Sequence, residues 1–205
     1  GNFQTLETSP TKWSVALEQN IAWKITLPET GQSTPVISKG KVFFTTLKSV
    51  ESDAEVGKDI IAWCCDALTG TLLWKKEILG KYTLRLSGCF SDSSAPPPVT
   101  DGKHVVFINA SSGISCFTLD GDPVWKQDFF TVGRCLPFLH QGRIVFTRQI
   151  YTPEKNGRFP HKYANAPKEM WTQLQALDIK TGRISWTTEC GINMGVSVIP
   201  QKTSD

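Results

Sequence analysis

The chain has 205 residues, of which 40% are hydrophobic and 20% charged, an ordinary balance for a globular chain with an apolar core. Its 22 Lys and Arg against 19 Asp and Glu leave a formal charge of +3, too small to indicate nucleic acid or an anionic membrane as the main partner. No apolar run has the roughly 20 residues of a membrane-spanning helix, so no membrane span is expected. Sixteen Gly, twelve Pro and seven Trp beside two Met favour turns and strands over helices.

Four tryptophans recur along the chain and begin similar phrases. Trp23 lies in IAWKITL, Trp74 in LLWKKEI, Trp125 in PVWKQDF and Trp186 in ISWTTEC, at separations of 51, 51 and 61 residues. The last three follow turns rich in Asp and Gly, at 66–71, 120–122 and 178–183. Trp-marked repetition at such a period is typical of a β-propeller, in which each repeat forms one blade.

Each repeat predicts four short strands, which we name A to D: a proline-containing A strand, an apolar B strand, a C strand ending near an Asp, and a D strand carrying the Trp. The predicted strands are 33–37, 41–47, 60–66 and 71–77, then 95–99, 104–109, 113–119 and 123–128, then 134–139, 143–149, 171–177 and 183–189. A free D strand at 21–26 precedes them. The predicted fold class is therefore all-β: a β-propeller of four-stranded antiparallel blades, three complete and partial at both ends. Residues 1–20 are a lead-in segment and 21–205 form the propeller.

The repeated residues have a structural explanation. A flat ring on the D strand can lie over the Gly of the adjoining turn and seal the gap between blades. The Gly also supplies the positive φ that the hairpin between strands C and D requires. The residues given this structural role are Trp23, then Asp66, Thr69, Gly70 and Trp74, then Asp120, Gly121 and Trp125, and finally Asp178, Thr181, Gly182 and Trp186.

These residues carry a family resemblance. The phrase Ala-x-Asp-x-x-Thr-Gly-x-x-x-Trp, which Ala176 to Trp186 match fully, resembles the repeat of quinoprotein-type propellers, named for the cofactor pyrroloquinoline quinone (PQQ). The first repeat matches with Cys64 in place of Ala, and the second is shortened. Residues 12–46 look like the first segment of PQQ-like propeller proteins of planctomycete bacteria, relatives of the outer-membrane barrel-assembly lipoprotein. The resemblance implies an exported protein, periplasmic or secreted, and most such propellers bind no cofactor.

Three blades are fewer than the roughly four to eight that close a known propeller. An open arc would expose apolar blade faces at both ends, which soluble proteins avoid. We therefore expect the partner of these faces to be the missing blades of a longer propeller, and we expect this chain to be its N-terminal part. Assembly of two or more copies into a homo-oligomer is the alternative.

Long connections gather on one rim of the predicted disc. In an antiparallel meander, loops between strands B and C and links from strand D to the next strand A share one rim, and the short A–B and C–D turns share the other. Long loops on one rim favour a contact surface for a protein or ligand. The residues predicted for this contact are Lys81, Tyr82 and Arg85 in the first D–A link, and Lys155, Arg158, Phe159, His161, Lys162 and Tyr163 in the 150–170 insertion.

No motif for catalysis or metal binding emerges. The three His are scattered, and the six Cys lack CxxC spacing. Cys64, Cys65 and Cys116 fall in apolar strands and are interpreted as buried small side chains, with a bridge among Cys89, Cys135 and Cys190 as the alternative. Asn109-Ala110-Ser111 is a formal glycosylation sequon.

The expected function follows from these patterns together. It is a non-enzymatic platform that binds a protein or ligand, without catalytic residues, metal or cofactor. The alternative is a fragment of a PQQ- and calcium-dependent alcohol or sugar dehydrogenase. In those enzymes a disulfide between adjacent cysteines lies over the cofactor, but Cys64 and Cys65 point to opposite faces of a strand.

Overall fold

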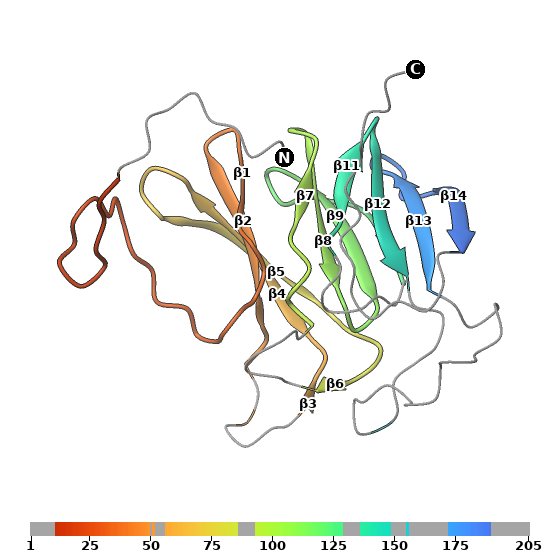
Figure 1. Ribbon diagram of the computed structural model, residues 1–205, viewed down its shortest axis with the longest axis horizontal. Coiled ribbons are helices and arrows are strands. Elements are labelled where there is room, and N and C mark those ends of the chain that lie inside the picture. The colour runs from red at the N-terminus through yellow and green to blue at the C-terminus, as the bar shows by residue number, and fades with distance from the viewer. Residues whose placement is uncertain are drawn as a thin grey trace.

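The computed structural model describes residues 11–49, 51, 56–85, 93–128, 136–148, 155 and 172–189. Within these ranges the secondary structure is entirely β, and no helix long and apolar enough to cross a membrane occurs there. Three four-stranded antiparallel sheets stand side by side, in the order in which the chain forms them (Figure 1). The all-β fold and the three complete blades are thus confirmed.

Each blade is a meander of strands A, B, C and D. Blade 1 contains β1 (Val36–Ser38), β2 (Lys41–Leu47), β4 (Ile60–Asp66) and β5 (Leu72–Ile78). Blade 2 contains β7 (Val99–Thr100), β8 (His104–Asn109), β9 (Gly113–Thr118) and β10 (Pro123–Gln127). Blade 3 contains β11 (Phe138–His140), β12 (Arg143–Arg148), β13 (Gln173–Asp178) and β14 (Ile184–Glu189). A small extra sheet pairs β3 (Val56–Gly57) with β6 (Leu84–Arg85) and was not predicted.

The A strands are shorter than predicted, and proline explains where they begin. β1, β7 and β11 each start at the residue after a proline, namely Pro35, Pro98 and Pro137. Proline has no N–H to donate to a ladder, so regular pairing starts only beyond it. The predicted A strands at 33–37, 95–99 and 134–139 therefore began too early.

The prediction of a D strand at 21–26 was wrong. Residues 21–27 lie in no sheet. They are held on blade 1 by side chains instead: Trp23 and Leu27 pack on the apolar cluster that contains Phe44 and Trp63. A β-strand requires a backbone partner, and this segment makes its contacts through side chains.

In every blade, one residue from each of the four strands lines up in a row across the sheet, which we call the column of that blade. In blade 1 the cross-strand register aligns Val36, Phe43, Cys64 and Trp74. The aligned residues are Val99, Val106, Cys116 and Trp125 in blade 2, and Phe138, Val145, Ala176 and Trp186 in blade 3. Phe43, Cys64 and Trp74 pack against Val105, Phe107 and Phe117 of blade 2, and the blade 2 column packs in the same way on blade 3. The core of this molecule therefore lies between its sheets. Fully burying a large apolar side chain there contributes roughly 1.5–3 kcal/mol to stability.

Trp23, Trp74 and Trp125 each cover the C–D turn glycine of the blade that follows them. A Cβ added to Gly70 would lie 2.6 Å from the Trp23 ring, one on Gly121 would lie 3.0 Å from Trp74, and one on Gly182 would lie 2.6 Å from Trp125. The three glycines have φ values of 71°, 93° and 68°, in the left-handed region that favours glycine. The hairpin geometry and the ring contact thus both require glycine at this position, which we call the glycine seat.

A β-bulge precedes each tryptophan of the three blades. The register between strands C and D skips Leu73, Val124 and Ser185, each directly before Trp74, Trp125 or Trp186. A bulge bends its strand and increases the local twist. The repeated bulge therefore gives each ring the same place relative to its sheet.

Replacing a seat glycine is expected to loosen two blades at once. We expect Gly182→Ala to lower the free energy of unfolding by about 3 kcal/mol, from the positive φ and from the overlap with Trp125. Gly40 is the matched control, because its φ of 73° is similar but an added Cβ would meet nothing within 4 Å. Gly40→Ala should cost only about 1 kcal/mol. Urea unfolding followed by circular dichroism measures both variants, and equal losses would contradict the role of the ring.

Candidate functional site

The first and third C–D turns are built around a carboxylate. The Oδ1 atom of Asp66 accepts hydrogen bonds from the N–H groups of Leu68 and Thr69, at 2.9 and 2.8 Å, and from the Thr69 hydroxyl at 3.0 Å. Asp178 repeats the arrangement with Lys180 and Thr181. The bonds from Thr69 lower the pKa of Asp66, and the hydroxyl bond from Thr181 is the main cause that lowers the pKa of Asp178. These turns stay preformed at neutral pH.

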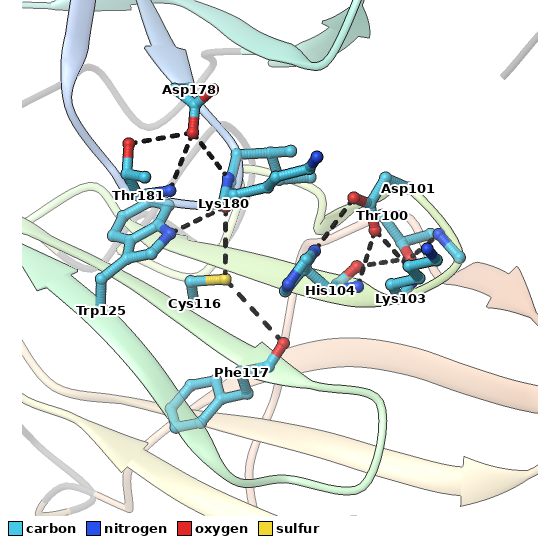
Figure 2. Close-up of polar contacts among 12 residues, drawn as sticks. Thr100, Asp101, Lys103, His104, Cys116, Phe117, Trp125, Asp178, Lys180 and Thr181 are labelled. Carbon is cyan, nitrogen blue, oxygen red and sulfur yellow. Dashed lines mark hydrogen bonds and ion pairs between the residues drawn. The ribbon is translucent and has the colours of Figure 1, made fainter.

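The turn aims one carbonyl at the tryptophan of the preceding repeat. Trp125 donates from Nε1 to the Ile179 carbonyl at 2.8 Å. Figure 2 shows the Trp125 ring beside the Asp178 turn. Trp23 donates to Ala67 at 2.9 Å and Trp74 to Leu119 at 3.0 Å. Each indole is thus held by its face on a glycine and by its N–H on a carbonyl. The motif residues of these turns are therefore brought together at the joints between blades.

Blade 2 uses a different residue in its shorter turn. Thr118 occupies the place of Asp66: its hydroxyl accepts from Asp122 N–H, and its carbonyl accepts from Gly121 N–H. Asp120, which was grouped with the repeat motif, instead forms an ion pair with Lys41 of blade 1 at 2.5 Å. Lys41 also donates to the Leu119 carbonyl at 3.0 Å. Asp120 therefore links two blades rather than shaping its own turn.

The three cysteines of the apolar strands are free and buried. Cys64 packs in the cluster between blades 1 and 2, whereas Cys65 faces the cluster that contains Trp23. Burial raises the pKa of the Cys64 thiol to about 11 and that of Cys116 to about 12, which makes both unreactive at neutral pH. The adjacent pair therefore does not fit the disulfide of PQQ dehydrogenases. Cys89, Cys135 and Cys190 lie outside the described residues.

His104 and Asp101 form a pair with a structural role. The His104 Nδ1 atom lies 3.0 Å from Asp101 Oδ2 (Figure 2). Burial would raise the pKa of Asp101, but hydrogen bonds from His104 and Lys103 outweigh it and lower the pKa. The contacts join the A–B turn of blade 2 to the first residue of β8. In the described part of the chain, no three His, Cys, Asp or Glu residues gather as metal ligands.

The opposite rim of blades 1 and 2 is joined by Asn109, at the end of β8. We call it the loop rim; here it comprises the B–C loop at 56–59, the D–A link at 79–85 and the turn at 110–112. The Asn109 Nδ2 atom donates to the carbonyls of Lys58 at 2.8 Å and Ile78 at 2.9 Å. One side chain thereby ties the loop and link of blade 1 to the turn of blade 2.

Backbone contacts reinforce this joint. The N–H groups of Lys81 and Tyr82 both donate to the Ser111 carbonyl, at 2.7 and 3.0 Å. Gly80 N–H donates to Asp59, and a Cβ on Gly80 would overlap the Lys58 carbonyl and the Ser111 side chain. The pairing of β3 with β6 adds a third tie. The loop rim between blades 1 and 2 is therefore a fixed surface.

The predicted contact residues are only partly described. Lys81 is exposed and its ammonium lies 5.7 Å from the centroid of the half-buried Tyr82 ring. Arg85 belongs to β6, beside β3, and Lys155 is exposed. Arg158, Phe159, His161, Lys162 and Tyr163 lie outside the described residues. Of the predicted set, Lys81, Tyr82 and Arg85 are thus placed on the loop rim.

A basic groove on blade 1 was missed by sequence reasoning. It is lined by Lys48, Trp63, Lys75, Lys76 and Glu77, among others, and has a volume of about 500 Å³. Lys48 pairs with Glu77 at 2.5 Å, and Lys75 lies 5.6 Å from the Trp63 ring centroid. The adjacent Lys75 and Lys76 in LLWKKEI could have indicated a basic surface. They lie in a segment that was interpreted only as a strand of the repeat.

The burial of Asn109 also bears on whether the formal glycosylation sequon Asn109-Ala110-Ser111 can be used. Its side chain is fully buried, and its amide nitrogen is engaged twice, so the folded chain does not offer it for glycosylation. We expect Asn109→Asp to cost about 2–4 kcal/mol, because a carboxylate cannot donate and would remain buried beside two carbonyls. Asn20→Asp is the control, since that amide is exposed and donates to the Lys12 carbonyl. Urea unfolding compares them, and a loss at Asn109 as small as that at Asn20 would refute the tie.

Comparisons with known proteins agree with this geometry. The family model described as outer membrane protein assembly factor BamB matches residues 58–203. No curated protein matches the chain significantly. Among solved structures, BamB from Moraxella catarrhalis superposes with a TM-score of 0.51 at 14% identity, over 85% of this chain and 45% of that one.

A europium-containing methanol dehydrogenase gives a TM-score of 0.53 at 12% identity, over 85% of this chain and 37% of that one. The chain thus spans less than half the length of either structure, and at these identities the likeness concerns the fold alone. The family match covers more than two thirds of the sequence. The chain therefore belongs to the BamB family of PQQ-like β-propellers.

Proposed function

We propose that the chain is a non-enzymatic propeller module that uses its loop rim as a contact platform for a protein partner, in an exported, periplasmic or secreted protein. The observation that carries the proposal is the Asn109 joint, which fixes loops of two blades into one surface. A prearranged surface loses little conformational entropy when it binds, which favours affinity. The family description, an outer membrane protein assembly factor, supports a periplasmic setting and a role in protein contacts.

The two rims differ in whether their groups are already used in contacts within the chain. On the rim of the C–D turns, the glycines and the carbonyls of Ala67, Leu119 and Ile179 already hold tryptophans of the same chain. On the loop rim, the backbone ties lie beneath Lys81 and Tyr82, and Lys81 is exposed. Tyrosine is among the side chains that are enriched at protein interfaces. The loop rim is therefore the better candidate for a partner.

Site-specific photo-cross-linking in cells of the source organism tests the platform. We expect a photoreactive phenylalanine analogue at Tyr82 to give a discrete cross-linked species. The same analogue at Leu68 should give none, because Leu68 is 84% exposed but lies in a C–D turn on the opposite rim. Adding Lys81→Glu to the Tyr82 variant should weaken the cross-link about tenfold, as for a lost charge at an interface. Equal cross-linking at Tyr82 and Leu68 would contradict the choice of rim.

The alternative, part of a PQQ- and calcium-dependent dehydrogenase, is tested on the purified chain. We propose that the module works without this cofactor, since Cys64 and Cys65 lie on opposite faces of β4 in separate clusters. Adding PQQ with Ca²⁺ should then leave the melting temperature unchanged, whereas a ligand at 100 times its Kd would stabilise the fold by about 2.7 kcal/mol. Reduction of an artificial electron acceptor by an alcohol under these conditions would establish the dehydrogenase instead.

A further inference from the structure

The basic groove of blade 1 has a counterpart in the next repeat. Its lining includes Lys75, which directly follows the column residue Trp74. A second groove, of about 360 Å³, is lined by Lys126, which directly follows Trp125. The second groove is also lined by residues 77–79 of β5, so it lies between two complete blades. A groove with a lysine at this strand position is thus a repeated feature of the blades.

The segment before blade 1 takes the part in the basic groove that the end of β5 takes in the second groove. Pro28, five positions after Trp23, lines the basic groove. Leu79, five positions after Trp74, lines the second groove. Because the second groove is open although both of its blades are complete, an open groove at this place does not require that a blade be missing.

The floor of the basic groove is held in place by contacts within blade 1. The Trp63 side chain, only 8% exposed, stacks on Phe44 with ring centroids 6.0 Å apart, and its Nε1 atom donates to the Thr46 hydroxyl at 3.0 Å. The side of the groove that contains Pro28 is tied to β2, since Leu47 N–H donates to the Thr30 carbonyl at 2.8 Å. The groove is therefore formed before a ligand arrives, which reduces the entropy lost on binding.

The charges of the groove leave one cation available. Lys48 is neutralised by its ion pair with Glu77. Lys75 is exposed, its ammonium lies 5.6 Å from the Trp63 ring centroid, and no carboxylate of the described residues pairs with it. An indole face stabilises a nearby cation without neutralising its charge, so Lys75 can still pair with an anion.

The shape and charge of the groove favour a peptide with a single carboxylate. The Glu77 carboxylate would repel a dense polyanion. The Trp63 ring is too buried to offer its face to a sugar. A small molecule binds tightly where most of its surface is enclosed, whereas this groove of about 500 Å³ is open along one side. An extended peptide needs only one of its sides covered, and the lining residues Pro28 and Ile61 offer apolar surface to it.

We propose that the basic groove binds a short acidic segment of a partner protein, with one Asp or Glu side chain at Lys75 and a neighbouring apolar side chain on Pro28 and Ile61. This site is separate from Tyr82 and Lys81 on the loop rim. It therefore does not rest on the function proposed for that rim.

Selection from a phage-displayed library of random heptapeptides on the immobilised full chain tests the proposal. We expect enriched peptides to carry Asp or Glu within two positions of an aromatic or aliphatic residue. Each enriched class is then labelled with fluorescein and titrated by fluorescence anisotropy. Lys75→Met should weaken binding of an acidic class about tenfold or more, because it removes the charge but keeps an apolar stem beside Trp63. Lys75→Arg should bind like the parent chain, because the charge is kept.

The matched control is Lys126→Met, which removes the same charge from the equivalent position in the next blade and should leave the affinity unchanged. Circular dichroism checks that each variant keeps its strand signal. The absence of any enriched peptide, or of any whose affinity falls in Lys75→Met, would overturn the proposal. Equal losses in Lys75→Met and Lys126→Met would do the same, since binding would then follow overall charge. Binding of dextran sulfate through Lys75 with no peptide enriched would assign the groove to a polyanion instead.

Discussion

The contact between an indole ring and a glycine turn is the constraint on which the rest of the molecule depends. It demands a glycine twice over, since the hairpin needs a positive φ and the ring leaves no room for a Cβ at Gly70 or Gly182. It also orients the ring, because the indole N–H reaches the carbonyl of the residue that follows the turn Asp or Thr. With the rings fixed, neighbouring sheets have one spacing, and the columns headed by Trp74 and Trp125 can close their apolar clusters.

Because of this contact, the C–D turns serve the packing of the blades, whereas the loop rim does not. The C–D turns are occupied by packing, so their sequence is tied to the ring that each of them holds. The described part of the loop rim holds none of these tryptophan rings. Its backbone is held by Asn109 and the Ser111 carbonyl instead. A change of exposed side chain at Lys81 leaves those ties intact, because they involve the backbone of residues 58, 78, 81 and 82. Exposed side chains on the rim can therefore change while the blades keep their packing.

Periodic features of the fold were predictable from the sequence, and features that depend on distant contacts were not. The tryptophan spacing and the Thr-Gly turns predicted three blades, because each blade repeats the same local chemistry. Asn109 gave no signal, since its two acceptors lie 51 and 31 residues away and are backbone carbonyls. Asp120 was misassigned because a turn Asp and an inter-blade Asp look alike, and only the position of Lys41 separates them. The segment 21–26 has the composition of a strand, but composition does not supply the partner that pairing requires.

The joints also give the row of blades a direction. Trp74 of blade 1 packs on the turn of blade 2 and Trp125 of blade 2 on the turn of blade 3, so these interfaces are head-to-tail rather than self-complementary. Adding blades along such a row never gives its last tryptophan a following turn, and only ring closure can do so. Closure would require the last ring to reach Gly70, which Trp23 already covers. A closed ring is therefore consistent with these contacts only if residues 21–26 complete its last blade. In such a ring the seat at Gly70 would already be filled by Trp23.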